Sequence, residues 1–166
     1  MPSRLVETTP WRQQMTNPEA VVRAAYAAYN AGELERMVGL CSPTIEWSDP
    51  DNHLVRGQAD LLAHLKWGYD AFPGAQIVVD SLSVDGDRVT TEAEYRGCHS
   101  AALSLPDGTT VPPSGRTISF RLAMVGEVHD GLLVAQRSYW DNFDVYTQMG
   151  LLSPDNATSL VGEVSK

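Results

Sequence analysis

The sequence predicts an α+β protein in which helices pack on one side of a curved, mostly antiparallel sheet. Apolar residues recur at helical spacing up to about residue 72, and from residue 76 onward they alternate with polar ones. Helices first and long strands second is the order typical of this fold class. The 166 residues, 43% of them hydrophobic, suit one domain with a core of its own.

Three helices are predicted in the first half of the chain. The first begins where Asn17 can cap the helix and Pro18 fits its first turn. The third ends at Pro73-Gly74, which cannot continue a helix. The predicted helical ranges are 18–30, 33–40 and 58–72, and a short strand at 44–48 precedes the third helix.

Long strands are predicted in the second half. Asp85-Gly86-Asp87 and His129-Asp130-Gly131 are hairpin-turn sequences, and each separates two runs of alternating residues. Alternation in the first run predicts that Val78, Leu82 and Val84 share one face. The predicted strands are 76–85, 88–100, 117–128 and 132–140; 105–116 is a loop rich in Pro and Gly, and a closing helix is expected over 142–151.

The predicted organisation is one domain between two polar ends. Residues 1–16 lack periodicity and are expected to form a flexible N-terminal arm, residues 17–152 form the single domain, and residues 153–166 form a polar C-terminal tail. No stretch approaches the roughly 18 apolar residues that span a bilayer. The first residues also lack the apolar centre of a signal peptide, so a cytoplasmic location is expected.

Composition excludes several classes of partner and cofactor. A net charge of −9 disfavours binding to nucleic acid or to an anionic membrane. Cys41 and Cys98 fit no metal-ligand spacing and are expected to be reduced thiols. The chain has no Gly-rich phosphate loop, no paired-histidine motif and no Gly-x-Ser-x-Gly elbow. We therefore expect no metal, no cofactor and no covalent serine.

Several short motifs follow one another in an informative order. They are Phe72-Pro73, Arg96-Gly97-Cys98-His99-Ser100, Pro113-Ser114-Gly115-Arg116, Asp130-Gly131 with Asp141 ten residues later, and Gln148-Met149-Gly150-Leu151. Together they resemble the SnoaL-like polyketide cyclase family of the NTF2-like superfamily, over about residues 17–152. The family typically has Gly-Thr-His-Thr-Gly at residues 97–101 and Gln-Leu-Gly at 148–150, where this chain differs.

This resemblance implies an NTF2-like cone whose three helices and curved sheet enclose a pocket. It also implies a cofactor-independent enzyme of natural-product (antibiotic) biosynthesis, which closes a ring in a small hydrophobic polyketide-like substrate. Members of such folds commonly pair through the outer face of the sheet, so a homodimer is expected.

Three residues are predicted to be catalytic. Asp141 matches the position of the family's acid/base aspartate, and a carboxyl group in an apolar pocket can remove and return a proton. Its alternative role is the N-cap of the closing helix. Tyr139 shares the parity of Asp141, provided that no β-bulge intervenes, and could donate to an oxyanion. His99 could polarise a carbonyl or orient Asp141, or it could be a buried histidine bonded to backbone.

A second group is predicted to contact the substrate. Aromatic residues at helical spacing could line the pocket or fill the core, and residues of the first strand and its turn could lie at the pocket mouth. Asp49 is also ordinary turn sequence, which would leave it solvated. The predicted substrate-binding residues are Trp47, Tyr29, Tyr26, Trp67, Phe72, Tyr95, His53 and Asp49.

Two other functions fit the same sequence. One is the opening of an epoxide, by water as in a hydrolase or by an internal hydroxyl that forms an ether ring. Arg137 shares the parity of Asp141, but an Asp–Arg–Asp site would need a second aspartate that the sequence does not reveal. The other is a non-catalytic module that binds a ligand or dimerises.

Overall fold

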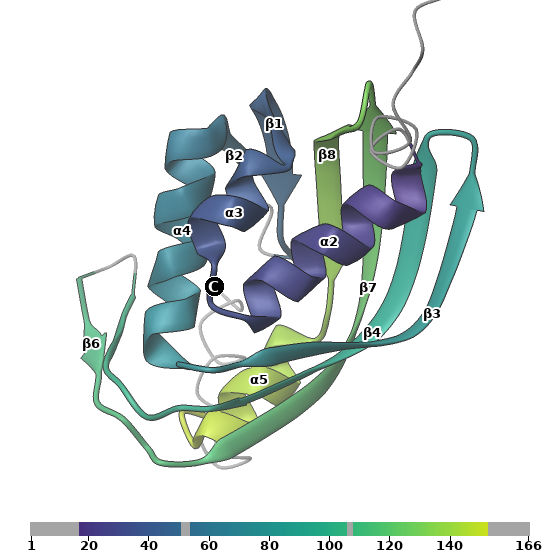
Figure 1. The fold of residues 1–166 in the computed structure, drawn as a ribbon. Coiled ribbons are helices and arrows are strands. Elements are labelled where there is room, and N and C mark those ends of the chain that lie inside the picture. The colour runs from purple at the N-terminus through teal and green to yellow at the C-terminus, as the bar shows by residue number, and fades with distance from the viewer. Residues whose placement is uncertain (1–16, 51–53, 106–107, 153–166) are drawn as a thin grey trace, which may run out of the picture.

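The computed structural model describes residues 17–50, 54–105 and 108–152. The predicted arm at 1–16, the predicted tail at 153–166 and His53 lie outside the described residues. The described part is an α+β fold with one curved, mostly antiparallel sheet, as the sequence predicts (Figure 1).

The main sheet has six strands in the order β2-β1-β8-β7-β4-β3. Neighbouring strands are antiparallel except for β1 and β8, which run parallel. A small hairpin of two further strands stands apart from it. The bounds are β1 Cys41–Ser48, β2 Leu54–Arg56, β3 Gln76–Asp85, β4 Arg88–Cys98, β5 Leu103–Ser104, β6 Thr110–Val111, β7 Thr117–His129 and β8 Leu132–Tyr139.

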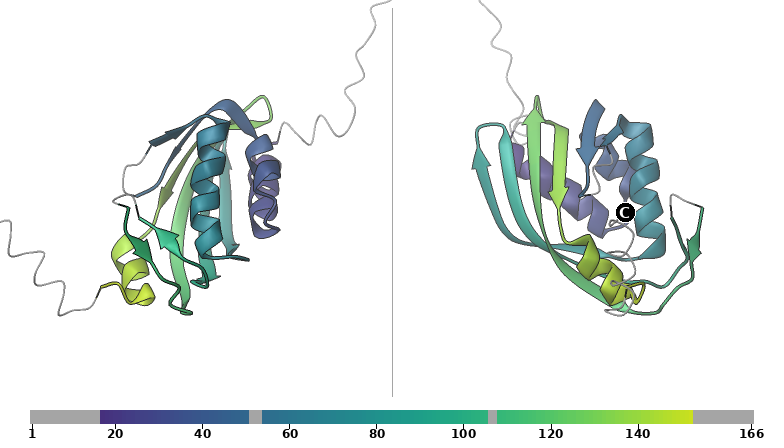
Figure 2. Two further views of the ribbon diagram at one scale, coloured as in Figure 1. Left: turned by 90° about the vertical axis from the view of Figure 1, so that its left-hand side faces the viewer. Right: turned by 180° about the vertical axis from the view of Figure 1, so that it is seen from behind.

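The helices lie on the concave side of the sheet and at one of its ends (Figures 1 and 2). As predicted, Asn17 caps the first helix by accepting a hydrogen bond from the backbone N–H of Glu19. Gly150 ends the last helix in the left-handed conformation that glycine adopts without strain. The bounds are α2 Pro18–Asn30, α3 Leu34–Gly39, α4 Gln58–Ala71 and α5 Asn142–Met149.

Three short strands were not predicted from the sequence. These are β2, β5 and β6, each of two or three residues. Such strands carry too few alternating positions to produce a detectable pattern. They pair because tertiary packing brings them beside β1 or beside each other.

The predicted shared face of Val78, Leu82 and Val84 is wrong for Val78. The register with β4 skips Asp80, which makes a β-bulge between Val79 and Ser81. Beyond the bulge the alternation changes sides. Leu82 therefore packs on the core together with Val79, whereas Val78 lies on the opposite, exposed face. Val84 shares the parity of Leu82 and pairs with the buried Val89, but its side chain is exposed.

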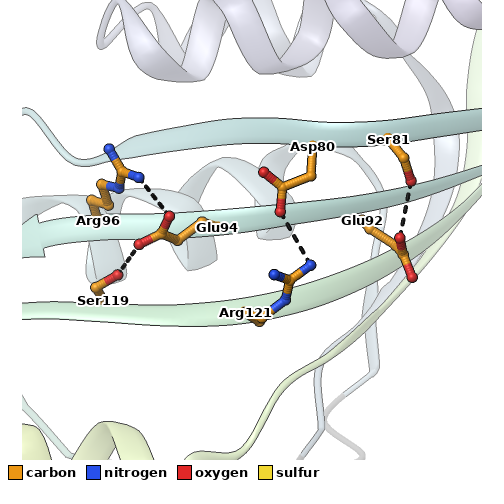
Figure 3. A network of polar contacts seen from close by, with 7 residues as sticks. All are labelled: Asp80, Ser81, Glu92, Glu94, Arg96, Ser119 and Arg121. Atoms are coloured by element: carbon orange, nitrogen blue, oxygen red, sulfur yellow. Dashed lines mark hydrogen bonds and ion pairs between the residues drawn. The ribbon is translucent and has the colours of Figure 1, made fainter.

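The two faces of the sheet differ in chemistry. The concave face carries the core, including Ala93, Ile118 and Met124. The opposite face carries a polar network over β3, β4 and β7 (Figure 3). There Glu94 bonds Arg96 and Ser119, Arg121 pairs with Asp80, and Ser81 bonds Glu92.

Candidate functional site

A cavity of about 210 Å³ lies between the concave face of the sheet and helices α2, α4 and α5. Its wall is mostly aromatic and aliphatic. Pockets for drug-sized ligands usually span about 300–1,000 Å³. The cavity therefore suits a small, compact and largely apolar ligand.

Asp49 is the carboxylate of this cavity. Its Oδ1 accepts a hydrogen bond from Trp47 Nε1 at 3.1 Å, and its Oδ2 lies 2.7 Å from His64 Nε2. The side chains of Asp49 and His64 are only 14% and 20% exposed. When Asp49 is ionised it can only accept hydrogen bonds, so His64 donates from Nε2. Two donors thus fix the orientation of one carboxylate at the cavity wall.

The local sequence explains this position. Along β1, Ile45 and Trp47 point inward, and Asp49 directly after the strand keeps the same parity. His64 lies on α4 three residues after the buried Leu61, so it falls beside the face that α4 turns to the core. Helix packing closes the gap of 15 residues between Asp49 and His64.

Two tyrosines add hydroxyl groups to the same cavity. Tyr29 on α2 and Tyr95 on β4 both line it and share a side-chain hydrogen bond. Burial, reinforced by Tyr95, raises the pKa of Tyr29 well above its usual value. Burial also raises the pKa of Tyr95 to about 12. Both therefore stay protonated near neutral pH and can act as hydrogen-bond donors.

Gln136 and Ser138 on β8 supply further polar groups to the cavity wall. Gln136 is 1% exposed, and neither its Nε2 nor its Oε1 has a hydrogen-bond partner among the described residues. Burying an amide without partners costs about 1–3 kcal/mol. Sequence reasoning missed both residues, since it assigned the opposite parity to the end of this strand.

The predicted orientation of Asp141 and Tyr139 is wrong. The β7–β8 register skips Val134, so a β-bulge reverses the alternation, and Gln136 and Ser138 point inward instead. Tyr139 is 53% exposed and does not line the cavity. Asp141 is also exposed, and its Oδ1 accepts from the backbone N–H groups of residues 143 and 144. The structure thus places Asp141 as the N-cap of α5, the alternative that the sequence left open.

His99 is fully buried but does not line the cavity. Its Nδ1 accepts a hydrogen bond from the Ser114 backbone N–H at 3.2 Å, and its ring packs on Phe72. Burial lowers its pKa and favours the neutral form. This arrangement matches the alternative of a buried histidine bonded to backbone.

Most predicted substrate-binding residues do line the cavity. Tyr26 does not: it is buried beside Thr91, and burial raises its pKa to about 12. The main residue that sequence reasoning missed is His64. Its neighbours on α4 form an apolar stripe, and a single histidine beside such a stripe gives no local signal of a partner. The predicted residues found at the cavity are Trp47, Tyr29, Trp67, Phe72, Tyr95 and Asp49.

Within the described ranges, no group of three or more His, Cys, Asp or Glu side chains is placed to hold a metal ion. None of the helices in the described part of the chain has the length and apolar character needed to cross a membrane. The chemistry that the cavity's own residues offer is proton transfer at Asp49, assisted by hydroxyl and amide donors.

Comparisons with known proteins agree with this architecture. Residues 22–136 match the SnoaL-like domain family. The crystal structure of AclR from Streptomyces galilaeus, a proposed hydroxylase, is 25% identical, with a TM-score of 0.70 over 84% of this chain and 99% of AclR. The crystal structure of IdmH from Streptomyces antibioticus, a proposed polyketide cyclase, is also 25% identical. Its TM-score is 0.68 over 81% of this chain and 99% of IdmH. A proposed SnoaL-like polyketide cyclase from Jannaschia sp. CCS1 shares the fold at 21% identity. Its TM-score is 0.72 over 89% of this chain and 99% of the Jannaschia chain. A comparison with curated protein sequences finds no significant match.

Proposed function

Because the chain belongs to the SnoaL-like domain family, we propose that it is a cofactor-independent acid/base enzyme that closes a ring in a small, hydrophobic, polyketide-like substrate. One observation carries the proposal: a carboxylate held by two donors in the wall of an apolar cavity. The likeness to IdmH supports the substrate class, since IdmH is described as a proposed polyketide cyclase.

In this proposal Asp49 replaces Asp141 as the acid/base group. Asp49 removes a proton from a carbon next to a carbonyl, and the resulting enolate attacks a second carbonyl of the same substrate. A carbon–carbon bond forms, and the attacked carbonyl oxygen takes the proton back from Asp49 as an alcohol. Tyr95 donates a hydrogen bond to the oxygen on which negative charge develops. The reaction is an isomerisation and consumes no cofactor.

The other arrangements predicted from sequence receive less support. An Asp–Arg–Asp epoxide hydrolase would need a second carboxylate, and Asp49 is the only one among the described residues of the cavity wall. Arg137 lies on the opposite side of β8 from Gln136 and bonds Glu127 at 2.8 Å. Cyclisation needs only the single carboxylate that is present.

The test compares Asp49→Asn with Asp141→Asn. The probe is 2-tetralone, a bicyclic ketone whose acidic carbon-bound protons exchange with deuterium in D₂O, followed by NMR. Asp49→Asn should slow the catalysed exchange about 100-fold or more, because the base is lost. Asp141→Asn should leave the rate within about twofold, because Asn caps a helix as well as Asp does.

Two outcomes would contradict the proposal, given circular dichroism spectra that show both variants folded. Loss of exchange only in Asp141→Asn would return the acid/base role to Asp141. Absence of any acceleration by the wild-type protein would favour a non-catalytic ligand-binding module.

A further inference from the structure

The side-chain amide of Gln136 stands out from the other amides of this fold. Gln148 pairs with one backbone residue through both of its ends: its Nε2 donates to Ser119 O, and its Oε1 accepts from Ser119 N, each at 2.8 Å. Asn30 does the same with Ile77, at 2.9 and 2.7 Å. Each of these amides therefore binds a donor that sits beside an acceptor.

Gln136 offers the same donor–acceptor edge but has no such partner. Its two amide atoms are closed off from solvent and make no hydrogen bond within the described part of the chain. The side chain nevertheless forms part of the cavity wall. Partners for this amide must therefore come from outside the described residues, and a ligand or an ordered water in the cavity can supply them.

The position of Gln136 relates it to the proposed acid/base group. Gln136 is the register partner of Trp47 on the parallel strand β1, and Asp49 follows two residues later on the same face. Two residues along a strand correspond to about 7 Å. A substrate held at Gln136 would therefore extend toward Asp49 within the length of one ring system.

We propose, building on the proposed function, that Gln136 determines substrate selectivity by binding a neutral donor–acceptor edge of the substrate, such as a carboxamide or a lactam. The amide Nε2 donates to the ligand's carbonyl oxygen, and Oε1 accepts from the ligand's N–H. A charged head group fits less well, because Gln136 offers it no opposite charge and transfer into an apolar wall penalises an ion. The carboxylate of Asp49 adds repulsion against an anion.

The test uses two matched ligand pairs in a ligand-observed NMR titration. The first pair is 2-naphthamide and 2-acetylnaphthalene, which have similar shapes but differ in the N–H donor. The second pair is 2-quinolone, a lactam, and its N-methyl derivative. We expect the wild-type protein to bind the donor-containing member of at least one pair about tenfold more tightly, as one additional buried hydrogen bond allows. The pair with the larger ratio distinguishes a carboxamide head from a ring lactam.

The key variant is Gln136→Met, which keeps the length of the side chain and removes both polar atoms. It should lose the tenfold preference, and it should weaken 2-naphthamide more than 2-acetylnaphthalene, because the amide loses two hydrogen bonds and the ketone loses one. Without ligand it should melt at a temperature higher by about 3 °C, since an unpartnered buried amide is gone. Gln76→Met is the control: the Gln76 amide already donates to the backbone carbonyls of Asn30 and Ala75 and does not line the cavity, so ligand preference should not change.

Three results would overturn the proposal. The first is that the wild type binds the two members of each pair with equal affinity. The second is that Gln136→Met keeps the wild-type preference for the ligand with the N–H donor. The third is that Gln136→Met melts at a lower temperature and binds all four ligands equally more weakly. The last result would make Gln136 a structural residue. These binding measurements do not depend on turnover. If the Asp49 proposal failed in the exchange assay, that failure could therefore be told apart from a failure of the Gln136 proposal.

Discussion

The neighbouring strands β1 and β8 end in the same local arrangement with different chemistry. Near the end of β1, Trp47 Nε1 donates to Asp49 Oδ1 at 3.1 Å; just after β8, Trp140 Nε1 donates to Asn142 Oδ1 at 2.6 Å. All four of these side chains line the cavity. Each indole therefore orients the Asp or Asn two residues after it.

The two strand ends differ in whether the residue bonded to the indole can accept and release a proton. Asp49 is a carboxylate with His64 at its second oxygen, whereas Asn142 is an amide that does not titrate. Asp141, between Trp140 and Asn142, points away from the cavity and caps α5. A shift of one residue along the chain thus separates a helix cap from a pocket position. An acidic residue near a strand end is therefore weak evidence for catalysis by itself. Whether its side chain faces the cavity is stronger evidence.

Replacing the two tryptophans tests this comparison most directly. Trp47→Phe removes the donor that orients Asp49, so the maximal exchange rate with 2-tetralone should fall about tenfold with little change in KM. Trp140→Phe removes a donor to a group that transfers no proton, and its ring packs on Phe120 in the wall. It should therefore raise KM more than it lowers the rate. Equal loss of rate in both variants would show that the two strand ends are equivalent.

Replacing His99 tests whether this buried imidazole takes part in the chemistry of the pocket. Its pKa is lowered in the folded protein, so the unfolded chain takes up this proton first as the pH falls below about 6.5. The wild type should lose stability from this group below pH 6.5, by at most about 1.4 kcal/mol per pH unit. His99→Asn, which retains an acceptor for the Ser114 N–H, should show a flatter decline.

The measurement for His99 is urea unfolding at pH 7 and pH 5.5 for both proteins, together with the exchange rate at pH 7. A decline as steep in His99→Asn as in the wild type would refute the assignment. If His99→Asn lost exchange activity without losing stability, His99 would have a role in the reaction.

Asp141 should matter for stability rather than for chemistry. Asp141→Ala removes the cap of α5 and should lower the free energy of unfolding by about 1 kcal/mol, or the melting temperature by about 2–4 °C. Asp141→Asn should have a smaller effect, because its amide oxygen can accept the same N–H groups. Thermal unfolding followed by circular dichroism measures both; equal losses would exclude capping as the cause.

The smallest effect is expected on the outer face of the sheet. Arg121 pairs with Asp80 at 3.2 Å, but both side chains are largely exposed (Figure 3). Arg121→Gln should therefore change the free energy of unfolding by less than about 0.5 kcal/mol, and 1 M NaCl should reduce the difference further. Urea unfolding at low and high salt measures it. A larger, salt-insensitive loss would mean that the outer network supports the cavity.

Local patterns in the sequence were sufficient for most of the fold. Asn17 and Pro18 begin α2, and the turns at residues 85–87 and 129–131 join long antiparallel strands. Val89, Thr91 and Ala93 alternate on the buried face of β4 as predicted. These features depend on contacts between near neighbours in the chain, so the residue order alone determines them.

The candidate site depended on contacts that only the tertiary structure supplies. The bulges at Asp80 and Val134 each insert one residue, which reverses every side chain beyond them, and no local pattern announces them. The pairing of Asp49 with His64 requires α4 to pack against the end of β1. Parity counting predicted which residues alternate with one another, but the packing of strands and helices decided which set faces the cavity.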